Sequence, residues 1–163
     1  MSLVPKVGLV PETHETLTHH VHAHLDVFVD GVPVVVSAGI GINIKDPAVK
    51  TFGTGDDTGY GGIDPPCKQA CISPLHTHDP SGVLHTESAS AVPNTLGQFF
   101  GEWAVPISTT CLGPKCGGVK VYIDGKQVTE DPSKIQLLDH REIAVVVGTP
   151  PATIPSIGDF SQA

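Results

Sequence analysis

The chain has 163 residues and a formal net charge of −8; 39% of its residues are hydrophobic and 16% are charged. This length fits one domain with a core of its own, and the low charged fraction argues against disorder. Phosphate binding needs clustered Lys and Arg, so we exclude nucleic acid and anionic membrane surfaces as partners. No apolar stretch approaches the roughly 20 residues of a membrane span.

The 18 glycines and 15 prolines are spread along the chain, which indicates many turns and short strands. We therefore predict a mainly β fold (β-rich α+β) of antiparallel hairpins with one short helix near 95–103. Residues 1–18 are expected as an extended arm and 150–163 as a flexible tail. Residues 19–149 are expected to form a single β-rich, metal-binding domain.

The first predicted strand begins with three alternating histidines, His20, His22 and His24. A strand sends alternate residues to one face, so these imidazoles share a face that points away from the main core. The other face carries the apolar row Val21–Val29. Asp30-Gly31 then predicts a tight hairpin turn into a second strand.

The segment after this hairpin has weaker signals. Gly39–Ile44 is expected to extend the sheet, and the glycine-rich stretch Thr51–Pro66 is expected to be a long loop. Cys67 and Cys71 follow it, and a second pair, Cys111 and Cys116, lies further on. Two local disulfides are the simplest interpretation, with structural zinc and free thiols as alternatives.

A second histidine cluster surrounds the predicted type I turn Asp79-Pro80-Ser81-Gly82. If Leu75–Asp79 and Val83–Glu87 pair across this turn, His76 faces His85 and His78 faces Val83. The three imidazoles then share one face, and directly opposed Cβ atoms lie about 5 Å apart. A register slip of one residue would separate them.

Glu87 lies two residues after His85 and on the same face. It is a candidate fourth ligand or general base, or an ordinary exposed carboxylate. We expect His22 and His24 to lie beside this hairpin and to share its metal, with His20 peripheral. His14, His19 and His140 are interpreted as ordinary surface or core histidines.

The last part of the chain supplies the helix and further strands. Thr95-x-x-Gln98 has the form of a capping box, and the apolar residues of 96–103 recur at helical spacing. Val119–Ile123, the turn Asp124-Gly125 and Lys126–Thr129 repeat the pattern of the first hairpin. Leu137–His140 and Arg141–Val147 are expected as a further strand region.

Several of these motifs occur together in one known group of proteins. They are HxHxHL from His20, the HTHDxSGxxHxE string from His76 to Glu87, and TLGQFF from Thr95. The chain resembles an uncharacterised family of small, mostly exported or membrane-anchored prokaryotic proteins, over roughly residues 20–148. The His-x-His with a downstream histidine also resembles the cupin metal motif, although the usual glycine spacing and glutamate of that motif are absent.

These observations predict one transition-metal ion bound by imidazoles, with zinc slightly ahead of copper and iron also compatible. The candidate ligands are His22, His24, His76, His78 and His85. The predicted function is that of an extracytoplasmic transition-metal-binding protein with a multi-histidine site, and a metalloenzyme that activates water or oxygen for an unknown small-molecule substrate is one candidate activity. Alternatives are a metal-binding or trafficking protein, a metal-stapled structural domain, or a pH-responsive histidine cluster.

Disulfides imply an oxidising compartment. The sequence carries no basic segment followed by an apolar segment of signal-peptide type. From the expected disulfides we predict a secreted, periplasmic or surface-anchored location, and we expect that the leader has been removed.

Overall fold

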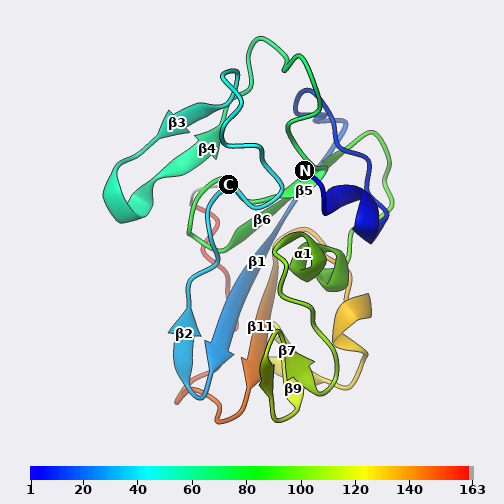
Figure 1. Cartoon of the computed structure of the whole chain (residues 1–163). Coiled ribbons are helices and arrows are strands. Elements are labelled where there is room, and N and C mark those ends of the chain that lie inside the picture. The colour runs from blue at the N-terminus through cyan, green and yellow to red at the C-terminus, as the bar shows by residue number, and fades with distance from the viewer. Residues whose placement is uncertain (162–163) are drawn as a thin grey trace.

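The computed structural model describes residues 1–161, and a mixed seven-stranded sheet lies at its centre (Figure 1). The strands follow one another across the sheet in the order β10-β9-β11-β1-β6-β5, and β2 also pairs with β1. The sheet strands are β1 (His19–Val29), β2 (Val32–Val34), β5 (Leu75–His76), β6 (Val83–Ser88), β9 (Val119–Ile123), β10 (Lys126–Val128) and β11 (Arg141–Val147). This architecture confirms the mainly β prediction.

Strand β1 is the element on which the sheet is built. It pairs in parallel with β11 along one edge. Along its other edge it pairs antiparallel with β6 near its start and with β2 near its end. Residues far apart in the sequence are therefore aligned on β1, and their faces are fixed by its alternation.

The odd-numbered face of β1 carries the main core, as its apolar row predicts. Ala23, Leu25 and Val27 are buried there. The only α-helix of the described residues, α1 (Leu96–Glu102), buries Phe99 and Phe100 in the same cluster. The Thr95–Gln98 capping box is formed, because each side chain accepts a hydrogen bond from the other's backbone N–H. The predicted helix is thus confirmed.

The even-numbered face is divided into two regions. Towards the end of β1, Phe28 packs with Ala144 and Val146, and Ile154 of the C-terminal segment covers them. Towards its start, the face presents the histidines. Next to that end lies a small second core of the long β2–β5 connection, made of Ile42, Val49, Ile63, Cys67, Cys71 and Ile72, with Tyr60 packed against it.

Both Asp-Gly hairpins form as predicted. Asp30 and Gly31 have φ values of 50° and 82°, and Asp124 and Gly125 have values of 49° and 78°. These left-handed values define the twist that a two-residue hairpin turn requires. The turns join β1 to β2 and β9 to β10.

The β2–β5 connection differs from the prediction. Gly39–Ile44 forms turns instead of extending the sheet, since Gly39 and Gly41 adopt φ values of 73° and 75°. The expected loop Thr51–Pro66 contains a two-stranded hairpin of β3 (Lys50–Phe52) and β4 (Gly59–Gly61), with the 3₁₀ turn η2 (Gly55–Asp57) between them. This hairpin projects beside β5 and β6 in Figure 1.

The remaining elements are short. The 3₁₀ helix η1 (Val4–Val7) lies within the segment expected as an extended arm, and its Val4 is buried. Another 3₁₀ turn, η3 (Pro132–Lys134), precedes β11, which covers the predicted Arg141–Val147, whereas Leu137–His140 forms no strand. Among residues 1–161, no helix is both long and apolar enough to cross a bilayer.

Both cysteine pairs are disulfides, Cys67–Cys71 and Cys111–Cys116. The second links β7 (Cys111–Leu112) to β8 (Lys115–Cys116), which form a small hairpin of their own. The prediction of two local disulfides is confirmed, and no cysteine is free to bind zinc.

Candidate metal centre

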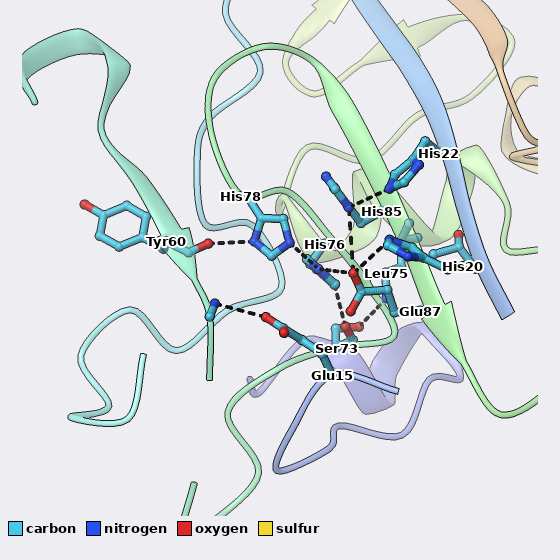
Figure 2. A network of polar contacts seen from close by, with 12 residues as sticks. Glu15, His20, His22, Tyr60, Ser73, Leu75, His76, His78, His85 and Glu87 are labelled. Atoms are coloured by element: carbon cyan, nitrogen blue, oxygen red, sulfur yellow. Dashed lines mark hydrogen bonds and ion pairs between the residues drawn. The ribbon is translucent and has the colours of Figure 1, made fainter. Parts of the chain in front are cut away.

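The register of three strands brings the two histidine clusters onto one face of the sheet. In the antiparallel pairing of β1 with β6, His22 lies opposite His85 and His20 lies opposite Glu87. In the pairing of β5 with β6, His76 lies opposite His85, as the hairpin reading predicts. Directly opposed residues point to the same side of a sheet, so these five side chains converge (Figure 2).

His78 joins them from outside the strands. Strand β5 ends at His76, and His78 lies in the bend before the turn. The Ser81 backbone N–H donates to Asp79 Oδ1 (2.9 Å), which fixes that turn. The His78 ring is held by the β3–β4 hairpin instead of by a strand partner (Figure 2).

Two backbone carbonyls orient the rings of His76 and His78. His76 Nδ1–H donates to the Ser73 carbonyl (2.9 Å), and His78 Nδ1–H donates to the Tyr60 carbonyl (2.6 Å). A carbonyl oxygen only accepts, so each Nδ1 carries the proton. In a neutral imidazole the lone pair then lies on Nε2. The two Nε2 atoms face each other at 3.3 Å.

His85 and Glu87 complete a four-residue set with these two rings. Glu87 Oε1 lies 3.8 Å from His76 Nε2 and 3.8 Å from His85 Nδ1. One donor atom from each of His76, His78, His85 and Glu87 lies within 4.8 Å of all the others. His76, His85 and Glu87 are buried and His78 is half-buried.

Burial keeps the imidazoles of His76 and His85 uncharged. Burial, and after it the neighbouring His78, lowers the pKa of His76 from 6.5 to about 3. The pKa of His85 falls well below its usual range for the same reason, with His76 as the main neighbour. Neutral imidazole is the form that binds metal ions, so these rings are ready to act as ligands at neutral pH.

Glu87 is held in a different electrostatic state. Burial raises its pKa to about 7, and the charges of Glu15 and Glu12 add to this effect. Its Oε2 atom is buried without a hydrogen-bond partner among the described residues. A buried carboxylate oxygen without a partner is costly, and a bound cation would remove that cost.

His20 and His22 form a second set with His85. His22 Nε2 lies 3.1 Å from His85 Nδ1, and His20 Nε2 lies 3.2 Å from Glu87 Oε1. Donor atoms of His20, His22 and His85 lie within 4.8 Å of one another. The pKa of His22 is lowered by burial and by His20. His20, expected to be peripheral, therefore touches the centre from its exposed side.

His24 lies apart from both sets, in a third group with Asp26 and Glu142. Its Nδ1 donates to Glu142 Oε2 (2.7 Å) and its Nε2 donates to the Ser81 carbonyl (3.0 Å). Burial opposes the charged form, but the hydrogen bond and charge of Glu142 raise the pKa of His24. Both ring nitrogens of His24 are therefore engaged in hydrogen bonds.

The residues that position His76 and His78 carry no sequence signal of their own. Ser73 and Tyr60 act through backbone carbonyls, which every residue type provides. Glu15 and Glu12 come from the segment before β1, and Glu15 accepts a hydrogen bond from the Gly62 backbone N–H (3.1 Å) (Figure 2). His14, His19 and His140 belong to none of the three groups.

Comparison with known proteins adds no relative. The chain matches no protein-family model, no curated protein and no solved structure.

Proposed function

We propose that this protein binds a transition-metal ion through His76 Nε2, His78 Nε2, His85 Nδ1 and Glu87 Oε1. The observation that supports this most is the 3.3 Å approach of the His76 and His78 Nε2 atoms. Carbonyl acceptors hold the protons of both rings on Nδ1, so two lone pairs face each other inside the protein. That arrangement is repulsive unless a proton or a cation lies between them.

The spacing of the donors fits a small tetrahedral ion. Zinc–imidazole bonds of about 2.0 Å place neighbouring ligands of a tetrahedral site about 3.3 Å apart. The distance between the His76 and His78 Nε2 atoms equals this value. Small side-chain shifts would shorten the 3.8 Å distances from Glu87 Oε1 to His76 Nε2 and His85 Nδ1 to the same value. Backbone hydrogen bonds to the second nitrogen of a ligand imidazole are also typical of metal sites.

The donor set restricts the metal. Imidazole and carboxylate ligands suit zinc, copper and iron. Thiolate is not offered, because all four cysteines are in disulfides. We place zinc ahead of copper because the set offers four protein donors within 4.8 Å of one another and is largely buried, as in zinc sites with four protein ligands.

A second candidate function is activation of a metal-bound water. It is favoured by Glu87, whose buried Oε2 has no partner. Three imidazoles then hold the ion and leave its fourth position to water, as in catalytic zinc sites. Glu87 would accept the proton of that water as general base.

We also propose an extracytoplasmic location. The two disulfides support it, since disulfides persist in oxidising compartments. The resemblance of the motifs to small exported prokaryotic proteins points to the same compartment.

Elemental analysis of untagged protein purified from its native compartment tests the metal proposal. We expect about one tightly bound zinc or copper ion per chain, and its loss in His76→Ala and in His85→Ala. His14→Ala is the matched control, because His14 is exposed and belongs to none of the histidine groups. Unchanged metal content in both site variants would overturn the proposal.

A further inference from the structure

We propose that the centre holds a second metal ion, bound by His20, His22 and His85 on the exposed side of the first. The inference rests on the proposed function, because the two positions share His85. Its first support is geometric. Three imidazoles of this set come within 4.8 Å of one another, and His22 Nε2 approaches His85 Nδ1 to 3.1 Å.

The two positions are distinct but adjacent. His76 and His78 approach from β5 and the bend that follows it, whereas His20 and His22 approach from β1. His85 and Glu87 lie on β6 between these two groups, as Figure 2 shows. The two ions of a two-metal site lie about 3.5–4 Å apart.

Glu87 is placed to link the two ions. Its Oε1 lies 3.2 Å from His20 Nε2 of the second set and 3.8 Å from His76 Nε2 of the first. Its Oε2 is buried and has no partner among residues 1–161. A bridging carboxylate uses one oxygen for each ion, which would satisfy this orphaned atom.

Sharing His85 has a consequence for the first ion. The Nδ1 atom of His85 can bind only one ion at a time. When both positions are filled, His85 completes the second set and the first ion keeps His76, His78 and Glu87. Two histidines and one carboxylate leave open positions on a metal. Filling the second position therefore converts a closed first site into one that admits an external ligand.

The second position is the weaker and more accessible one. The His20 side chain is 36% exposed, whereas His76 is fully buried. Glu12 and Glu15 act on Glu87 electrostatically and supply negative charge near the pair of cations. We expect the first ion to be retained through purification and the second to be taken up on titration.

Equilibrium dialysis against Cu²⁺, after a chelator has removed the resident ion, tests the stoichiometry. The expected result is two Cu²⁺ per chain at saturation for the unmodified protein and for the His14→Ala control. The double variant His20→Ala/His22→Ala is expected to bind one, since the first set is intact. Saturation of the unmodified protein at one ion overturns this inference and leaves the proposed function standing. Absence of any bound ion overturns both.

Electron paramagnetic resonance on the same samples locates the second ion. Two Cu²⁺ ions within about 4 Å couple to each other, so the integrated signal is expected to fall as the second equivalent binds. In the His20→Ala/His22→Ala variant the signal of the single ion is expected to remain full. A second equivalent that adds an undiminished signal to the unmodified protein lies elsewhere on the surface and overturns the inference, as does a double variant that still binds two ions.

Discussion

Glu142 Oε2 accepts a hydrogen bond from His24 Nδ1 at 2.7 Å, and the two residues are direct partners in the parallel pairing of β1 with β11. Both side chains are buried, and Glu142 Oε1 has no partner within residues 1–161. The pair lies on the histidine face of the sheet, one alternation beyond His22. The other ring nitrogen of His24, Nε2, donates to the Ser81 carbonyl (3.0 Å), so both nitrogens are engaged.

The first prediction separates His24 from metal binding. His24→Gln is expected to leave the metal content unchanged, because both His24 nitrogens are engaged in hydrogen bonds to Glu142 and Ser81. The same change leaves the buried carboxylate of Glu142 without its imidazole partner. The free energy of unfolding is therefore expected to fall by about 3 kcal/mol. Denaturant titration measures the loss, and adding Glu142→Gln is expected to restore part of it. Loss of the first ion in His24→Gln would show that His24 takes part in metal binding.

The second prediction concerns Gly61, the neighbour of the carbonyl that holds His78. A Cβ atom at Gly61 would lie 2.6 Å from His78 Nδ1. Gly61→Ala is therefore expected to displace the imidazole and to weaken metal affinity about 10–100-fold, as other losses of supporting contacts do. Competition with a chromophoric chelator measures the affinity.

The control for that variant is Gly62→Ala. A Cβ atom there meets only Lys50 Cδ at 3.6 Å, but Gly62 has a φ value of 58°. Alanine in this left-handed region costs about 1 kcal/mol of stability. Gly62→Ala should thus lower stability without changing affinity. Equal affinities for the two variants would mean that His78 is not a ligand.

Much of the centre could be predicted from the sequence because alternation and turn chemistry are local. The alternating histidines of 20–24 fixed one face of β1, and the turn at 79–82 fixed the pairing of His76 with His85. The proximity of the two clusters followed from how few clefts a small domain has. Strands β1 and β6 do pair, with His22 opposite His85.

The parts that could not be predicted depend on distant or backbone groups. The hydrogen bond of His24 to Glu142 could not be predicted, because Glu142 is 118 residues away in the sequence and is aligned only by the parallel β1–β11 pairing. The role of the Tyr60 carbonyl could not be predicted, because every residue type has a backbone carbonyl. The β3–β4 hairpin that carries it also lies in a segment predicted as a loop. His20 was expected to be peripheral, and its contact with Glu87 depends on the β1–β6 register.

The third prediction compares the two disulfides. Each closes a short loop, with sequence separations of 4 and 5, and in the chain-entropy model each contributes about 2 kcal/mol. Replacing Cys111 and Cys116 with Ala is expected to lower stability by about this amount and to leave the metal content unchanged. Thermal unfolding and elemental analysis measure the two effects.

The disulfide Cys67–Cys71 is expected to affect the metal as well. It lies in the small core against which Tyr60 packs, and the Tyr60 carbonyl orients His78. Replacing both cysteines with Ala should therefore lower metal affinity in addition to stability. Identical metal affinities for the two double variants would show that this core does not support the site.

The last prediction concerns Glu102 at the end of α1 and the pH dependence of stability. Glu102 Oε1 accepts a hydrogen bond from Ser73 Oγ (2.6 Å), and Oε2 is buried without a partner among the described residues. Burial raises the pKa of Glu102 from 4.5 to about 7, against the opposing effect of the Ser73 hydrogen bond. The folded state therefore holds this proton more tightly than the unfolded state does.

The sign of the effect follows from linkage. Below pH 4.5 the carboxyl is protonated in both states, and its contribution to stability is fully present. As the pH rises from 4.5 through 7, only the unfolded state releases the proton freely, so stability is lost, on the order of 2–3 kcal/mol.

Glu102→Gln stays neutral at every pH and should remove this loss. Its unfolding free energy relative to the unmodified protein is expected to increase between pH 5 and pH 8, as measured by urea denaturation, whereas Glu130→Gln, at an exposed position, should show no such trend. A pH-independent difference between Glu102→Gln and the unmodified protein would mean that Glu102 ionises normally in the fold.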